Sequence, residues 1–422
     1  MSASSLRLSG SVRGLNRAAV LRMLFERGPL PRYQIAEQLG LTGASISRIV
    51  AECLEAGLIQ ELPPANEPSD GSVSAGRRPI PIILNPDYYA VAAVHVGLLW
   101  LDVGLLNLQG QLIAHYRHRR PEHPAADILS SINQDIRALI SEHHRQLLAT
   151  GLTLNGQVSP ESGSILPYNV LAWPRISVTE SLALAPVRVE TNVYAMALAE
   201  YLHRPTDRGH SLLLVNIGTT IGMGLIVNHA ILRGQHGRLG FLEHLPGTWS
   251  DVVCEECGVK GCMSSAISDR AIFRQLRSLY PQKTFTNIQD VLEVGKTPGP
   301  AYEILRERAF DVGRFLAILA IQHDPTHLIL AGSCLLDNGQ QLAWVRSAYR
   351  HTLDSCAAEY SPVESPTVYA GELFPLVGAG TVALHTVFSA DLEITPGPPQ
   401  SPFSHKAQLS LVRAEQLTDP QS

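Results

Sequence analysis

The sequence feature that most constrains this chain is a group of one histidine and three cysteines in a short segment: His244, Cys254, Cys257 and Cys262. Three thiolates and one imidazole complete a tetrahedral ligand set for zinc and leave no position open for a catalytic water. Gly258 and Gly261 allow the loop between the cysteines to turn back on itself. The pattern therefore predicts one structural zinc ion per chain, whose binding contributes to local folding. The alternative is a set of reduced cysteines beside an unrelated histidine.

The length and charge of the chain predict several domains with different partners. A chain of 422 residues is too long for one compact core, which favours two or three domains. Residues 1–82 contain nine arginines, no lysine and seven acidic residues, a net charge of +2 against −5 for the whole chain. A slightly basic head on an acidic body is typical of a protein that binds nucleic acid at one end only.

The first eighty residues carry a helical pattern that is interrupted twice by glycine. Apolar residues recur at helical spacing up to a stop at Gly28 and Pro29, and a short second helix is expected from about Arg32 to Leu39. Gly40 then provides the tight turn of a helix-turn-helix, and Thr42 is expected to cap a third helix. This order of elements predicts a DNA-binding head.

The exposed face of the third helix carries two serines and one arginine, which suits a helix that meets base edges in the major groove. Two strands, at 57–59 and 80–84, flank a loop with paired arginines that could reach phosphates or a narrow minor groove. A three-helix bundle without a DNA role is the alternative. The residues expected to contact double-stranded DNA are Arg32, Thr42, Ser45, Ser47, Arg48, Arg77 and Arg78.

The remainder of the chain reads as an α/β protein without a membrane segment. The long apolar stretch 88–108 is interrupted by His95 and Asp102, so it favours two buried strands over a membrane span. The N-terminus lacks the apolar segment of a secretion signal, and we therefore expect a cytoplasmic location. Residues 395–422 are rich in Pro, Ser and Gln and are expected to be a disordered tail.

From about Arg13 to about Phe388 the chain resembles the ROK family, which is named for its repressors, open reading frames and sugar kinases. The cysteine cluster resembles the family's zinc loop with one extra residue between the first two cysteines. The segment 215–224 resembles its second phosphate loop, and the segments 324–332 and 378–380 resemble later family elements. The resemblance implies an actin-like ATPase, sugar-kinase-like fold of two α/β lobes. The N-terminal winged helix-turn-helix indicates the sugar-responsive repressor branch.

On this interpretation the chain divides into a winged helix-turn-helix over 1–84, a sugar-kinase-like effector and dimerisation domain over 85–394, and the tail. Catalysis is not expected, because the family's first phosphate loop begins with an aspartate where this chain has His95. The family's catalytic aspartate corresponds to Asn192, and an amide cannot accept a proton at neutral pH. The Gly218 loop is then a structural turn.

The sugar-binding pattern of the family is also altered. Asn169 and His244 match family positions that hold sugar hydroxyls, whereas Asn192, Phe241 and Ser264 replace carboxylates. Each lost hydrogen-bond partner in a buried site costs roughly 1–3 kcal/mol, so an ordinary hexose is expected to bind weakly. Either the effector is a modified or larger saccharide that packs on Phe241, or the cleft has no ligand and repression is constitutive. The expected effector-binding residues are Asn169, Asn192, Phe241 and His244.

The leading interpretation is therefore a DNA-binding repressor of carbohydrate-utilisation genes that acts as a dimer or tetramer on a symmetric operator. An effector would act by preferring one arrangement of the two lobes. A residual sugar kinase is the main alternative, and a regulator that docks a partner protein is a third. The sequence leaves the effector, the operator and the choice between repression and activation open.

Overall fold

The computed structural model of this chain describes residues 12–63, 79–159, 161–169, 171–182, 184–202, 211–246, 250–285, 287–333, 339–356 and 373–389. Arg77 and Arg78 of the predicted wing and the predicted tail at 395–422 lie outside the described residues. In the part of the chain that the structure describes, no helix is both long and apolar enough to cross a membrane.

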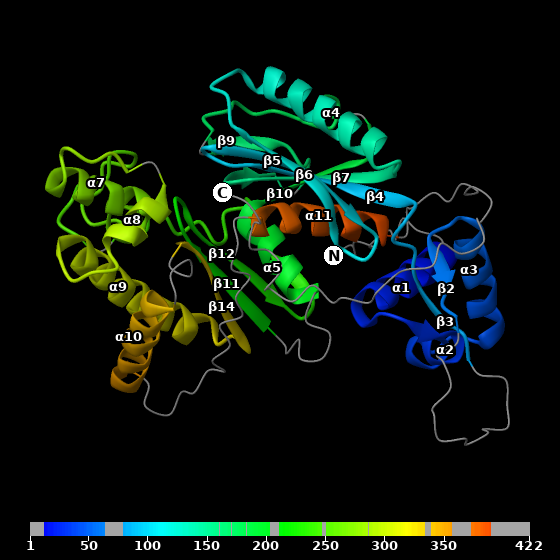
Figure 1. Ribbon diagram of the computed structural model, residues 1–422. Helices are drawn as coiled ribbons and strands as arrows, with labels where there is room; N and C mark the ends of the chain where they lie inside the picture. The colour runs from blue at the N-terminus through cyan, green and yellow to red at the C-terminus, as the bar shows by residue number, and fades with distance from the viewer. Residues whose placement is uncertain are drawn as a thin grey trace, which may run out of the picture.

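The N-terminal unit consists of three helices and a small antiparallel sheet of strand order β1-β3-β2 (Figure 1). Its elements are α1 (Val12–Arg27), β1 (Leu30–Pro31), α2 (Arg32–Leu39), α3 (Gly43–Glu55), β2 (Ile59–Glu61) and β3 (Pro81–Leu84). The bounds of the second helix and the turn at Gly40, which has a φ of 63°, are as predicted. One prediction was wrong: Gly57 does not begin a strand. With a φ of 72° it ends the turn that follows α3, and Gly57 N donates to the carbonyl of Leu54.

A five-stranded sheet of order β10-β7-β4-β5-β6 forms the core of the first lobe. The apolar stretch 88–108 forms two strands of this sheet, as predicted, and the structure shows that they pair antiparallel. Helix α4 covers one face of the sheet with apolar side chains such as Ile128 and Ile132. The elements are β4 (Tyr89–Val96), β5 (Trp100–Asn107), β6 (Leu112–Arg119), α4 (Ala125–Glu142), β7 (Gln146–Leu154) and β10 (Val187–Thr191). A two-stranded hairpin of β8 (Gly156–Val158) and β9 (Ile165–Asn169) follows β7.

A four-stranded sheet of order β13-β12-β11-β14 forms the core of the second lobe. Its strands are β11 (Ser211–Ile217), β12 (Ile221–Val227), β13 (Ala230–Leu232) and β14 (His327–Gly332). Residues of α5 (Asn192–Leu202) pack on one face, and residues of α9 (Pro300–His323) pack on the other. The remaining helices of this lobe are α6 (Met263–Ile267), α7 (Asp269–Leu279), α8 (Ile288–Val294) and α10 (Gln340–Cys356).

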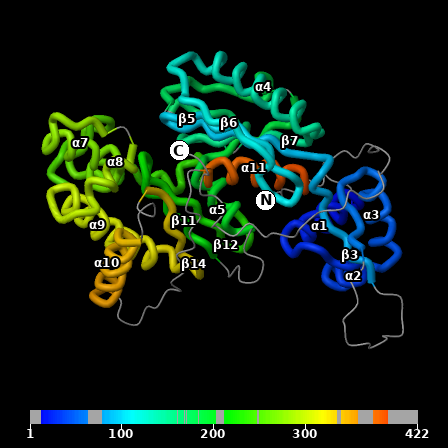
Figure 2. The backbone as a smooth tube through the Cα atoms, viewed as in Figure 1, coloured from blue at the N-terminus to red at the C-terminus, as the bar shows by residue number. Residues whose placement is uncertain are grey.

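The last helix, α11 (Phe374–Val387), returns to the first lobe and packs against β4, β7 and α5 (Figure 2). The approach to β7 is so close that a Cβ atom on Gly151 would lie 1.9 Å from the carbonyl oxygen of Ala379. Only glycine therefore fits at this point of the strand. A salt bridge of 2.5 Å between Arg233 and Glu190 connects a loop of the second lobe with β10 of the first.

The N-terminal unit shares one continuous hydrophobic core with the first lobe and α11. The rings of Phe25 in α1 and Phe388 after α11 have centroids 5.3 Å apart. Arg22 donates to the carbonyl oxygen of Phe388 at 3.4 Å, and the Tyr89 hydroxyl donates to the carbonyl of Ala56 at 3.0 Å. The head is thus packed onto the body at the C-terminal end of α11.

Candidate functional site

The predicted histidine and cysteine ligands come together in one cluster. Single ligand atoms of His244, Cys254, Cys257 and Cys262 all lie within 4.8 Å of one another. His244 Nδ1 lies 3.8 Å from the sulfur of Cys254 and 3.9 Å from that of Cys262. Gly258 and Gly261, with φ values of 70° and 71°, turn the loop as predicted. Three sulfurs and one imidazole nitrogen at this spacing could hold a metal ion in a closed site.

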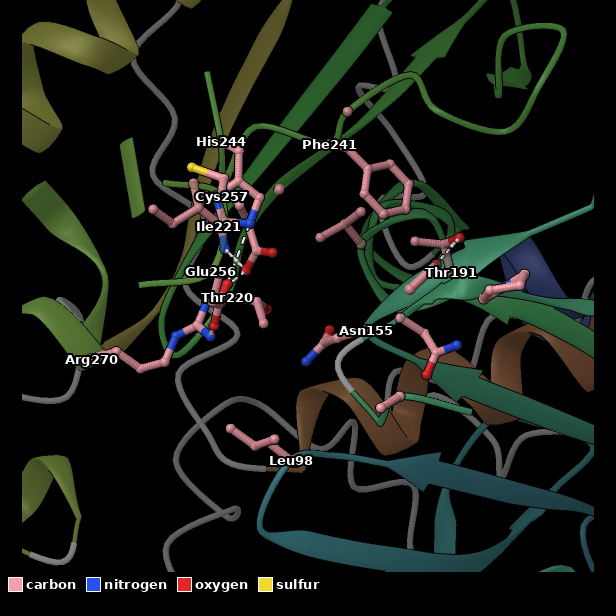
Figure 3. A pocket seen from close by; sticks show the side chains of 18 residues that line it. Leu98, Asn155, Thr191, Thr220, Ile221, Phe241, His244, Glu256, Cys257 and Arg270 are labelled. Atoms are coloured by element: carbon pink, nitrogen blue, oxygen red, sulfur yellow. Dashed lines mark hydrogen bonds and ion pairs between the residues drawn. The ribbon is translucent and has the colours of Figure 1, made fainter. Parts of the chain in front are cut away.

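A cavity of 690 Å³ lies beside this cluster and receives residues from both lobes (Figure 3). Its size is within the range of about 300–1,000 Å³ that is common for small-molecule sites. Its apolar lining includes Leu98, Val193 and Phe241. His244, Glu243, Glu256 and Arg270 form a polar wall, and Phe241 lies across the cavity from Glu256 and Arg270 (Figure 3). A ligand with both apolar surface and several hydrogen-bonding groups matches this lining.

The polar wall is organised around Arg270, which lies between two carboxylates. Arg270 Nη2 is 3.4 Å from Glu243 Oε1, and Arg270 Nη1 forms an ion pair with Glu256. Glu243 also accepts a hydrogen bond of 3.2 Å from the backbone N–H of Ile221. Burial raises the pKa of Glu243 above the usual value, while Arg270 and the backbone donor oppose this shift. Glu256 Oε2 lies 3.3 Å from His244 Nε2, the ring nitrogen that faces away from the cysteines.

Sequence reasoning missed these two carboxylates. It predicted a cleft depleted of acids, because Phe241 and Ser264 stand where family members have glutamates. Glu243 and Glu256 instead bring carboxylates to the same cavity, and Ser264 Oγ lies 3.4 Å from Arg270. The signal was present in the sequence, since Glu256 lies in the lengthened spacing between the first two cysteines.

Three of the four predicted effector residues line the cavity. Phe241 and His244 are part of the wall. Asn169 is also part of it, but its side-chain amide donates to the carbonyls of Leu166 and Trp173 at 2.6 and 2.9 Å. Its oxygen accepts from the backbone N–H groups of Leu171 and Trp173, both at 3.1 Å. The side-chain polar atoms of Asn169 therefore form hydrogen bonds with its own loop and stabilise the conformation of that loop.

Asn192, the fourth predicted effector residue, is buried beneath the wall and is absent from the lining of the cavity. Its amide donates to Asn155 Oδ1 at 2.9 Å, and Asn155 does line the cavity. Asn192 thus positions a residue that a ligand can reach.

His95 has the environment of a core residue. It is 7% exposed, and its Nδ1 lies 3.1 Å from the hydroxyl of Thr153. Burial lowers the pKa of His95 to about 4, with a smaller contribution from Arg117. The side chain is therefore neutral at pH 7, and it supplies no charge for binding a metal–nucleotide complex.

The glycine turn at Gly218 faces a carboxylate. The N–H of Gly218 donates to the carbonyl of Thr220 at 3.1 Å, and its own carbonyl accepts from Asp269 N at 2.9 Å. Asp269 is nearly buried and pairs with Arg308 Nη2 at 2.7 Å. Asp269 and Arg308 thus form a buried ion pair next to this turn, at the start of α7.

The predicted DNA-contact residues differ in whether their side chains bond within the protein or face the solvent. The hydroxyl oxygen of Thr42 caps α3 by accepting from Ser45 N at 3.2 Å, and it also contacts the Ser45 hydroxyl at 2.9 Å. Arg32 forms a salt bridge of 2.7 Å with Glu61 on β2. Ser47 and Arg48 are exposed on α3. The outward face of the helix therefore presents these two residues to solvent.

Comparison with known proteins gives a consistent set of relatives. The model of the ROK family matches residues 91–384. The DNA-binding transcriptional dual regulator NagC of Escherichia coli K12 is 27% identical over 335 residues, which cover 76% of this chain and 81% of the regulator.

Among solved structures, a ROK family transcriptional regulator described as a homologue of the E. coli MLC protein has a TM-score of 0.70 at 21% identity. The match covers 90% of this chain and 98% of that regulator. A ROK family glucokinase from Streptomyces griseus, in complex with glucose and AMPPNP, has a TM-score of 0.60 at 22% identity. That match covers 70% of this chain and 99% of the kinase. At these identities the two structures establish the fold alone.

Proposed function

This chain belongs to the ROK family, and from that premise we propose that it is a DNA-binding transcriptional repressor whose sugar-kinase-like part senses a saccharide. Residues 1–84 form the winged helix-turn-helix, and residues 85–394 form the effector and dimerisation domain. The protein acts in the cytoplasm, on operator DNA. The observation that carries this proposal is the N-terminal unit, where a capped α3 follows a glycine turn and directs Ser47 and Arg48 outwards.

The test is fluorescence anisotropy of the purified protein on DNA from upstream of its own gene, with and without saccharides. Arg48→Ala is expected to weaken specific binding by about 1–3 kcal/mol, the range for one bidentate base contact. Arg306→Ala is the matched control, because Arg306 is equally charged, 48% exposed and located on α9. Equal affinities for the two variants would contradict the assignment of α3 as the recognition helix.

The sugar-kinase-like part is proposed to be catalytically inactive. An amide at Asn192 cannot act as a general base. His95 stands where the family's first phosphate loop has an aspartate, and as a neutral side chain it offers no charge to a metal–nucleotide complex. A coupled assay is expected to detect no ATP-dependent phosphorylation of glucose or N-acetylglucosamine. Turnover at ordinary enzyme rates would refute this proposal.

The histidine and cysteine cluster is proposed to hold one structural zinc ion. The donor set fits zinc, since four ligand atoms complete a tetrahedral site and leave no coordination position for water. The ion would fix the loop that carries Glu256 and would hold the imidazole of His244 through Nδ1. With that nitrogen bound, Nε2 carries the proton and donates to the carboxylate of Glu256.

Effector control is proposed to run through α11. This helix packs on both the first sheet and α5, and the residue after it contacts the N-terminal unit. A ligand that prefers one arrangement of the lobes would therefore shift α11, and with it the residue that packs against the N-terminal unit. The alternative, a constitutive repressor without an effector, is disfavoured by a cavity of 690 Å³ with an organised polar wall. The active species is a dimer or tetramer.

A further inference from the structure

The polar wall of the cleft holds more negative than positive charge. Among the described residues that line the cavity, Arg270 is the only arginine or lysine, whereas Glu243 and Glu256 are both carboxylates. Three thiolates on a divalent ion would place a further net negative charge on the other side of His244. A ligand group that approaches this wall therefore meets an excess of acceptors and of negative potential.

Glu243 and Glu256 differ in how many further hydrogen bonds each can accept from a ligand. Glu243 is 12% exposed and already accepts from the Ile221 N–H, with Arg270 near the same oxygen. Glu256 is 45% exposed and lies between Arg270 and His244 Nε2 (Figure 3). An ionised carboxylate offers about four lone-pair sites, so Glu256 can accept further hydrogen bonds from the cavity side.

The place of Glu256 in the chain explains why it reaches the cavity. It is the second of the two residues between Cys254 and Cys257, so the turn of the cysteine loop sets its direction. Cys257 lines the cavity with it, whereas the preceding Glu255 is exposed and does not line the cavity. Two adjacent glutamates of equal charge thus occupy different environments.

We propose that Glu256 is the specificity-determining residue of the cleft and that it selects an amino sugar with a free ammonium group over neutral and phosphorylated sugars. This proposal rests on the proposed function of the cleft as a saccharide sensor. An ammonium donates charge-assisted hydrogen bonds to Glu256 and offsets the unbalanced carboxylate. A phosphate would be repelled by the same wall. Phe241, on the opposite side, provides an apolar surface for the C–H face of the ring.

The experiment is isothermal titration calorimetry of the full chain with glucosamine, N-acetylglucosamine, glucose and glucosamine 6-phosphate, at mildly acidic pH. Glucosamine is expected to bind roughly tenfold or more tightly than the other three, which corresponds to one charge-assisted hydrogen bond. In Glu256→Gln this preference should be lost. In Glu256→Asp, which keeps the charge, glucosamine should remain the preferred ligand.

Glu255→Gln is the matched control and should retain the preference, because it makes the same charge change one residue away. Metal analysis should give the same zinc content for all variants, which verifies that the cysteine loop is intact. The proposal is overturned if glucosamine binds no more tightly than N-acetylglucosamine, if none of the four sugars binds, or if Glu255→Gln and Glu256→Gln behave alike. Operator binding is measured separately by anisotropy, so a failure of the repressor assignment is distinguishable from a failure at Glu256.

Discussion

Removing the ring of Phe388 tests whether the N-terminal unit and the rest of the chain fold as one unit. Phe388 is 2% exposed, and its ring packs on Phe25 of α1 within the core that joins the N-terminal unit to α11. Replacing a buried phenylalanine by alanine costs about 3–5 kcal/mol, of which the aromatic pair accounts for about 0.5–1.5 kcal/mol. Against a total stability of about 5–15 kcal/mol, this is enough to release the head from the body.

The assay is hydrogen exchange of the α1 amides combined with urea unfolding. In Phe388→Ala, exchange in α1 is expected to accelerate while exchange in the strands of the second sheet stays unchanged. Phe388→Leu is the control, since an apolar side chain of similar size should cost less than about 1.5 kcal/mol. Unchanged exchange of α1 in Phe388→Ala, or equal losses in both variants, would refute the shared core.

Three further predictions concern other parts of the molecule. Burial lowers the pKa of His95 to about 4 in the folded protein, so the unfolded state takes up this proton at a higher pH. The free energy of unfolding should therefore fall by about 3 kcal/mol as the pH drops from about 6.5 to 4. His95→Gln should flatten that part of the stability curve. Removing the metal with a chelator should lower the melting temperature, and Cys257→Ser should lower zinc content below one per chain in metal analysis. Arg308→Met should cost about 3–5 kcal/mol in urea unfolding, because it leaves Asp269 buried without its cation. A loss below 1 kcal/mol would contradict that view of the pair.

The elements that sequence predicted well are those whose signal is local. Apolar periodicity, the turn at Gly40 and the cap at Thr42 are set by neighbours in the chain, and the second and third helices agree with them. The cysteine cluster was predictable for the same reason, since three of its four ligands lie within one short loop.

The elements that sequence missed depend on the conformation of individual loops, which residue type alone does not determine. Glu256 faces the cavity because of the turn of its loop, and its partner Arg270 comes from α7. The amide of Asn169 is consumed by its own loop, which a motif match cannot reveal because the match reports the residue type alone. The cleft therefore contains more hydrogen-bond acceptors than the loss of the family's carboxylates suggests.

The position of Phe388 also bears on how the protein is made. The first described helix of the head begins at Val12, yet the hydrophobic core of the head includes Leu384, Val387 and Phe388 from the last described helix and its end. A ribosome releases these residues only after the whole body has emerged. The nascent chain therefore lacks part of the packing around α1 until synthesis is almost finished. Under the proposed function, the N-terminal unit therefore has its complete hydrophobic core only once the part that senses the effector has been synthesised.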